Sequence, residues 1–82
     1  MKKYTIECNY SYKQRLNNSY YGNPRFYGVF NATDDGRRIA GKTASNAAAG
    51  YVIQNCRENK PYNVTFHVTA AGNVIIDYIR EV

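Results

Sequence analysis

The chain has 82 residues, and its 11 Lys and Arg against 6 Asp and Glu give a formal net charge of +5 and a pI of about 9.4. At this length we expect one domain with a small core. The charge favours an acidic partner, whether nucleic acid, an anionic membrane surface or a negatively charged protein face. No apolar run reaches membrane-spanning length or follows Lys2 and Lys3 as a signal peptide requires, so we expect a cytoplasmic protein without a membrane partner.

Two strand patterns and a loop precede the middle of the chain. Residues 2–12 alternate strictly between two sets of side chains, which predicts a half-buried strand. Residues 13–24 collect Asn, Ser, Gly and Pro, so we expect a mobile, basic loop there that carries tyrosines. Alternation resumes over residues 25–33, and Asp34-Asp35-Gly36 predicts a hairpin turn because Gly36 can take a positive φ. Residues 37–42 then form the return strand.

One segment has apolar side chains at helical spacing. It predicts an amphipathic helix over residues 45–59. Thr43 or Ser45 can cap its first turn, and Pro61 forbids its continuation. The apolar stripe of this helix consists of Ala49, Val52, Ile53 and Cys56.

Two further strands follow the helix, at residues 63–70 and 74–81, with a second hairpin turn at Ala71-Gly72-Asn73. The element order is therefore β-β-β-α-β-β. Hairpins joined by tight turns produce a mainly antiparallel sheet. We predict a single α+β binding domain over residues 1–82, with four or five strands and the helix packed on one face of the sheet.

The two cysteines lie on different predicted elements. Cys8 is on the first strand and Cys56 on the apolar stripe of the helix, so a disulfide could join them if the helix covers that strand. The alternative, which we favour, is a pair of buried thiols in a reducing compartment. The sequence alone does not decide between them.

No set of residues has the spacing of a catalytic or metal site. His67 is the only histidine, and we expect it at the surface or against a ligand rather than in catalysis. Asp34 and Asp35 are explained by the turn, and neither the cysteines nor Gly41-Lys42-Thr43 forms a zinc or phosphate motif. We therefore expect a protein that is not an enzyme and needs neither a cofactor nor a metal ion.

The sheet face away from the helix is predicted to be basic, amide-rich and aromatic. Such a face can bind phosphate through Arg and Lys, stack bases on Tyr and hydrogen-bond base edges through Asn. Exposed tyrosine also favours protein interfaces, and a sheet covered on one side needs a polar second face in any case. The residues that we nominate for binding a partner, on this face, the loop and the outer side of the helix, are Lys13, Arg15, Tyr20, Tyr21, Arg25, Tyr27, Asn31, Arg38, Lys42, Tyr51 and His67.

The middle of the chain, residues 26–56, combines a hairpin closed by Asp-Asp-Gly with a helix that starts in small residues, TASNAAAG. This layout resembles the three-stranded DNA-binding domains of the plant AP2 and phage-integrase arm-type families, which read the major groove with the sheet face. The resemblance nominates Arg25, Tyr27, Arg38 and Lys42 for contact with DNA. The second hairpin, after the helix, has no counterpart in those domains.

Over its whole length, the chain is similar to small phage-encoded accessory proteins, anti-CRISPR proteins among them. It shares their size, their richness in Asn and Tyr and their lack of catalytic residues. The resemblance implies a stoichiometric inhibitor in an infected or carrier host cell. Its partner would be a host protein or ribonucleoprotein complex. The surface that it occupies on this partner would be acidic, or would be one that normally contacts nucleic acid. The alternative is a nucleic-acid-binding module that touches DNA or RNA with the same face.

Overall fold

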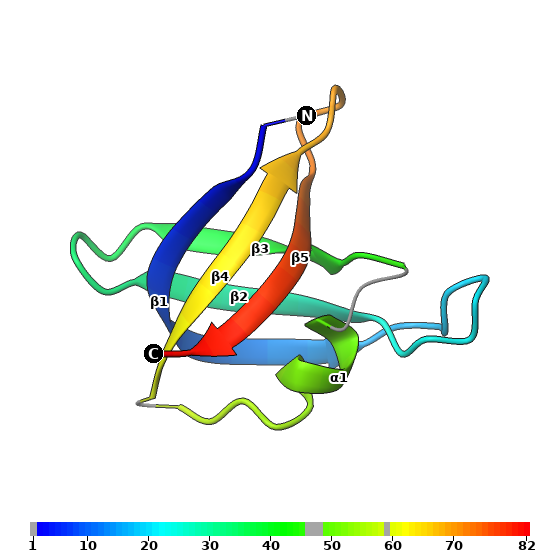
Figure 1. Ribbon diagram of the computed structural model, residues 1–82, viewed down its shortest axis with the longest axis horizontal. Helices are drawn as coiled ribbons and strands as arrows, with labels where there is room; N and C mark the ends of the chain where they lie inside the picture. Colours follow the sequence, from blue (N-terminus) through cyan, green and yellow to red (C-terminus); the bar gives the residue numbers. More distant parts are fainter. Residues whose placement is uncertain (1, 46–48, 59) are drawn as a thin grey trace.

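The computed structural model describes residues 2–45, 49–58 and 60–82 (Figure 1). The chain forms a small, mostly β domain, and the predicted order β-β-β-α-β-β is confirmed. The elements are β1 (Tyr4–Arg15), β2 (Phe26–Ala32), β3 (Arg38–Thr43), α1 (Ala49–Ile53), β4 (Pro61–Val68) and β5 (Val74–Glu81).

The predicted sheet of four or five mainly antiparallel strands is present, but its five strands close into a barrel, which the prediction of a sheet with the helix on one face did not include. The strand order around the barrel is β1-β2-β3-β5-β4. Strand β1 is long enough to pair antiparallel with both β2 and β4, and its register shifts between Tyr10 and Tyr12. In Figure 1, β4 and β5 cross in front of β2 and β3, with β1 bending between the two layers. A bulge of this kind lets one strand turn the corner between two halves of a barrel.

A short parallel contact completes the barrel. Strand β3 pairs with β5 only at Lys42↔Ile75 and Thr43↔Ile76, whereas the other strand pairs are antiparallel. The sequence signals of a hairpin are local, and this pairing joins residues more than thirty positions apart. Local sequence patterns therefore do not predict the closure of the barrel.

Helix α1 is much shorter than the predicted helix at residues 45–59. It covers Ala49–Ile53, while residues 46–48 and 59 of the prediction lie outside the described residues. After α1 the chain continues with hydrogen bonds between residues three positions apart, as in a 3₁₀ turn. They run from Asn55 N–H to Val52 O (3.0 Å) and from Cys56 N–H to Ile53 O (3.2 Å). The predicted cap at Thr43 is not made, because Thr43 is a buried residue of β3 whose hydroxyl accepts the Phe26 N–H at 3.1 Å.

The apolar stripe of the predicted helix does face the core. Ala49, Ile53 and Cys56 are buried, and Val52 packs against the same cluster. Cys8 and Cys56 are both buried and free, as the favoured interpretation held. Within the described residues, no helix is long and apolar enough to cross a membrane. The barrel interior is filled chiefly by Cys8, Phe26, Phe30, Ile39, Tyr62, Val64, Phe66, Ile76 and Ile79.

Candidate functional site

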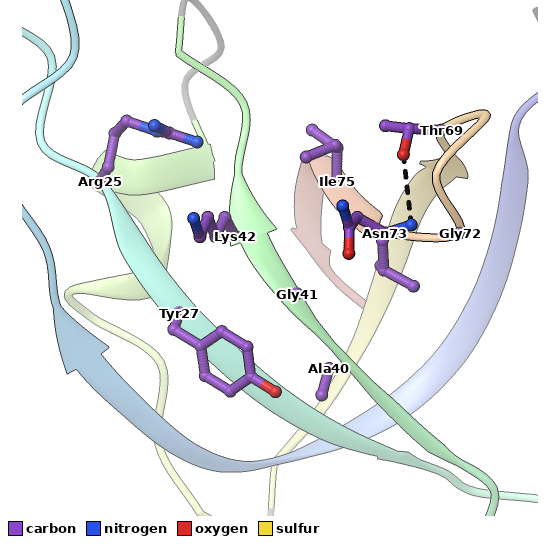
Figure 2. A pocket seen from close by; sticks show the side chains of 10 residues that line it. Arg25, Tyr27, Ala40, Gly41, Lys42, Thr69, Gly72, Asn73 and Ile75 are labelled. Atoms are coloured by element: carbon purple, nitrogen blue, oxygen red, sulfur yellow. Dashed lines mark hydrogen bonds between the residues drawn. The ribbon is translucent and has the colours of Figure 1, made fainter.

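A cleft of about 420 Å³ lies between the outer faces of β2 and β3 and the hairpin that joins β4 to β5 (Figure 2). Its volume falls in the range typical of ligand pockets. One wall belongs to β2 and β3 and the residue before them, and the other to the hairpin and the start of β5. The lining residues are Arg25, Tyr27, Ala40, Gly41 and Lys42 on the first wall and Thr69, Gly72, Asn73, Val74 and Ile75 on the second.

The cleft exists because β3 and β5 stay together for only two residue pairs. Before Lys42, β3 follows β2 and has no partner on its other edge among the described strands. The β4–β5 hairpin instead follows its own ladder up to Val68↔Val74. Gly41 marks the point where the two walls meet, because a Cβ there would collide with the main-chain oxygen of Val74. A glycine is needed at this close approach.

Tyr27 and Lys42 are direct cross-strand neighbours on the outer face of the barrel. Their neighbours Phe26, Gly28 and Thr43 are buried, so alternation directs the Tyr27 ring and the Lys42 amine outwards. Side chains opposite each other in this way have Cβ atoms about 5 Å apart. The cleft thus has a half-buried aromatic ring beside an exposed amine.

Arg25 adds a second positive charge to the same wall. Its Nε atom donates a hydrogen bond to the Thr43 carbonyl oxygen at 3.1 Å, which fixes the guanidinium at the end of β3. Figure 2 shows Arg25, Lys42 and Tyr27 along one wall and Asn73 and Thr69 on the other. Among the described residues that line the cleft, none is acidic. The wall is therefore suited to an anion that also offers an aromatic surface.

The hairpin wall is held by its own hydrogen bonds. The Thr69 N–H donates to Asn73 O at 2.9 Å, the Asn73 N–H donates to the Thr69 hydroxyl at 3.2 Å, and Gly72 has a φ of 85°. The sequence pattern predicts only a turn at Ala71-Gly72-Asn73, and Asn73 is not among the nominated residues. No local signal could have placed it opposite Tyr27, because that requires the barrel to close.

The structure brings three of the nominated residues into the cleft: Arg25, Tyr27 and Lys42. Asn31 and Arg38 face each other at the opposite end of the β2–β3 ladder. They lie four positions from Tyr27 and Lys42, roughly 13 Å along the strands. They share the outer face but do not line the cleft.

Lys13, Arg15 and Tyr51 instead make contacts within the protein. The Lys13 amine donates to the carbonyl oxygens at the end of α1. The Arg15 guanidinium donates to the Leu16 and Arg25 carbonyl oxygens at 2.9 and 3.1 Å and to the Asn18 side chain. The Tyr51 hydroxyl donates to Asn23 Oδ1 at 3.2 Å. Strand β1 runs to Arg15, so Lys13 and Arg15 lie on a strand and not in the predicted loop.

The His67 side chain also makes a contact within the protein. Its Nδ1 atom lies 2.7 Å from the Asp77 carboxylate, and both side chains are largely buried, with 14% and 10% of their areas exposed. Lys3 approaches the same carboxylate at 3.7 Å. His67 and Asp77 belong to β4 and β5, next to the register shift of their ladder, and Lys3 lies just before β1.

Tyr20 and Tyr21 project from the loop between β1 and β2. Their exposed fractions are 96% and 68%, and their rings meet edge to face with centroids 5.5 Å apart. The loop that carries them is closed by hydrogen bonds from Ser19 N–H to Asn23 O and from Gly22 N–H to Ser19 O. Two aromatic rings are thus presented to solvent on an ordered turn.

In the described part of the chain, no cluster of three His, Cys, Asp or Glu side chains could hold a metal ion. Comparisons with protein-family models, curated proteins and solved structures found no match to this chain.

Proposed function

We propose that this protein is a non-enzymatic module that binds single-stranded nucleic acid in the cleft between β2–β3 and the β4–β5 hairpin. The observation that carries the proposal is the placement of the Tyr27 ring beside Lys42 and Arg25 in a cleft whose described lining has no acidic residue. In the bound state a base stacks on Tyr27, and the flanking phosphates pair with Lys42 and Arg25.

Stacking of a base on Tyr27 favours a single strand over a duplex. A base can stack on a protein ring only after it has unpaired from its partner and unstacked from the neighbouring bases. The free energy required for this is much smaller in a single strand than in a duplex. Arg and Lys bind the phosphates without regard to sequence and supply a salt-dependent part of the affinity. The net charge of +5 adds long-range attraction for the same polyanion.

The barrel layout gives independent support by analogy. Five strands in the order β1-β2-β3-β5-β4, with a short helix between β3 and β4, are similar to the arrangement of an OB-fold barrel. OB-folds bind oligonucleotides on the face of their second and third strands, between the loops that follow the first and fourth strands. The cleft has this location in the barrel. Because barrels of this layout serve many functions, the proposal rests on the side chains that line the cleft.

A binding titration tests the proposal. Fluorescent single-stranded DNA, single-stranded RNA and duplex DNA of equal length are titrated at about 50 and 200 mM salt. We expect single strands to bind more tightly than the duplex, with affinity that falls steeply as salt rises. Tyr27→Ala should weaken binding by about fivefold to 100-fold, the range for loss of one stacked base.

Charge variants separate the cleft from general attraction. Arg25→Ala and Lys42→Ala should each weaken binding. Each should also reduce the slope of log affinity against log salt concentration by the contribution of about one phosphate contact. Arg57→Ala is the matched control, because it removes the same charge from an exposed residue that does not line the cleft. Tighter binding of duplex, or equal losses for Arg57→Ala and Lys42→Ala, would overturn the proposal.

The exposed pair Tyr20 and Tyr21 favours a second candidate function. Tyrosine gives large contact area at low entropic cost and is enriched in protein interfaces. In this candidate the protein is a phage-type inhibitor that docks its β1–β2 loop on a host defence complex. Cells with an active CRISPR nuclease test it: the wild-type protein should restore phage plaques, and Tyr20→Ala with Tyr21→Ala should abolish the effect. Unchanged phage restriction in the presence of the wild-type protein would rule it out for that nuclease.

A further inference from the structure

We infer that a second hollow, on the outer face of β4 and β5, binds a further nucleotide of the strand that is held in the cleft. The inference rests on the proposed function, because it extends the path of the same ligand. The hollow has a volume of about 280 Å³ and is lined by Thr65, Tyr78 and Arg80. Among the described residues, none lines both the hollow and the cleft.

The hollow combines an aromatic ring with positive charge. Tyr78 is 54% exposed, and Lys3 Nζ lies 5.9 Å from the centroid of its ring. Arg80 is exposed and lies two residues further along β5, so alternation places it on the same face. In the described part of the chain, Arg80 makes no salt bridge, and no lining residue of the hollow is acidic. A ring beside a cation can stack a base and pair with its phosphate.

A bulge in β5 turns Tyr78 towards solvent. Two adjacent residues of β4 pair with Ile76 and Tyr78, so Asp77 is an extra residue on β5. In a regular strand, residues three positions apart, such as Ile75 and Tyr78, would point to opposite faces. With one residue added, both lie on the outer face, whereas Ile76 and Ile79 fill the barrel interior.

The outer face of β5 therefore joins the two sites. Ile75 lines the cleft and precedes Tyr78 by three residues, which span about 10 Å of strand. Two cross-strand steps of about 5 Å each lead from Ile75 to Lys42 and from Lys42 to Tyr27. The two tyrosines are thus roughly 20 Å apart along the surface, which several nucleotides can span at about 3.4 Å per stacked nucleotide.

The acidic side chain of Asp77 belongs to the stretch of β5 between the cleft and the hollow. Its carboxylate lies 2.7 Å from His67 Nδ1 and 3.7 Å from Lys3 Nζ, and only 10% of the side chain is exposed. The charge of Lys3 offsets that of the carboxylate. A phosphate that passes between the two sites therefore meets little uncompensated negative charge.

A comparison of strand lengths tests the inference. At about 3.4 Å per nucleotide, a thymidine strand of about 3 nucleotides is too short to reach both tyrosines, whereas one of about 12 nucleotides spans them. Amide chemical shifts of the protein are recorded as each strand is added, because they give the affinity and locate the contact. We expect the shorter strand to shift amides around the cleft, and the longer strand to shift those of Thr65, Tyr78 and Arg80 as well.

Variants of the hollow should affect the longer strand alone. Tyr78→Ala should weaken its binding by about fivefold or more, and should leave the affinity of the shorter strand within about twofold of the wild type. Arg80→Ala should reduce the salt slope of the longer strand by the contribution of about one phosphate contact. Tyr78→Phe keeps the ring and should bind both strands as the wild type does. Tyr12→Ala is the matched control, because Tyr12 is also 54% exposed and lies outside both sets of lining residues.

The outcomes separate the inference from the proposed function. If Tyr27→Ala weakens the binding of both strands and Tyr78→Ala weakens neither, the cleft stands and the second site is refuted. Equal losses for Tyr78→Ala and Tyr12→Ala, or equal losses of Tyr78→Ala for the two strands, also refute it. A wild-type protein that does not bind the longer strand overturns both proposals. Thermal unfolding controls for folding, and Arg80→Ala decides the matter if Tyr78→Ala proves unstable.

Discussion

Lys13 of β1 donates a hydrogen bond from its Nζ atom to the carbonyl oxygen of Ile53, the last residue of α1, at a distance of 3.1 Å. The same amine donates to the next carbonyl oxygen, of Gln54, at 2.8 Å. The last carbonyl groups of a helix lack partners within the helix and carry partial negative charge, so a cation there stabilises the end. Helix α1 is too short to be stable by itself and depends on such contacts.

Replacement of Lys13 by Met should therefore affect stability and not binding. Lys13→Met keeps most of the side-chain stem but removes both hydrogen bonds, and we expect the free energy of unfolding to fall by about 1–2 kcal/mol. Denaturant unfolding monitored by tyrosine fluorescence measures this change. Lys42→Met is the matched variant, which should lose affinity for single-stranded nucleic acid with little change in stability. If Lys13→Met weakened binding and Lys42→Met lowered the stability instead, the roles assigned to the two lysines would be wrong.

Gly41 and its cross-strand partner Gly28 offer a test of how tightly the barrel closes. In Gly41→Ala the new methyl group meets the main chain of Val74, which cannot move without opening the β3–β5 contact. In Gly28→Ala it lies 2.6 Å from Cδ1 of Ile53, the flexible end of a side chain. We expect Gly41→Ala to cost about 2–3 kcal/mol of the free energy of unfolding and Gly28→Ala less, since rotamer changes relieve only the second clash. A larger loss for Gly28→Ala would place the tighter constraint at α1 instead.

The buried thiols predict how stability changes in alkaline solution. Burial raises the pKa of the Cys8 thiol from 9.0 to about 11, and burial also raises the pKa of Cys56 and of Tyr10. Between pH 9 and 11 the unfolded chain releases the Cys8 proton while the folded chain retains it. The contribution of this thiol to stability is therefore complete below pH 9 and falls by about 2–3 kcal/mol as the pH rises to 11.

Urea unfolding at pH 8, 9, 10 and 11 measures this decline, with Cys8→Ala as the control. The variant lacks the Cys8 titration but keeps those of Cys56 and Tyr10, so its free energy of unfolding should fall less over the same range. Equal declines in the two proteins would refute the assignment to Cys8. At pH 8 the folded protein should also react slowly with a thiol reagent, because thiolate is the reactive form and little is present.

Asn23 joins the β1–β2 loop to the segment around α1. Its Nδ2 atom donates to the Ser45 carbonyl oxygen at 3.1 Å, and its Oδ1 atom accepts the Tyr51 hydroxyl at 3.2 Å. Asn23→Ala removes both bonds, so the loop that carries Tyr20 and Tyr21 should open more often. Amide hydrogen exchange should accelerate at Gly22 and Asn23 by about tenfold, while amides in β4 keep their protection. Tyr51→Phe removes one of the two bonds and should give a smaller acceleration.

Local patterns in the sequence located the strands to within a few residues, with the largest error at the end of β1, which runs to Arg15 instead of residue 12. Alternation over residues 25–33 corresponds to β2 at Phe26–Ala32, and the pattern at residues 63–70 corresponds to β4 at Pro61–Val68. The turns at Gly36 and Gly72 have φ angles of 75° and 85°, as hairpin turns at glycine require. These features depend on a few neighbouring residues, so the chain encodes them locally.

The sequence also determined one wall of the candidate site. Arg25, Tyr27 and Lys42 follow from the alternation of two strands joined by a tight turn, because period two assigns each side chain to a face. The opposite wall, with Asn73, was decided only by the tertiary structure. It depends on the parallel contact of Lys42 with Ile75, which brings the second hairpin beside β3. Likewise, the helix pattern at residues 45–59 could not reveal that Lys13, forty residues before Ile53, holds the end of α1. Contacts between distant residues arise from closure of the whole barrel, and no local period encodes them.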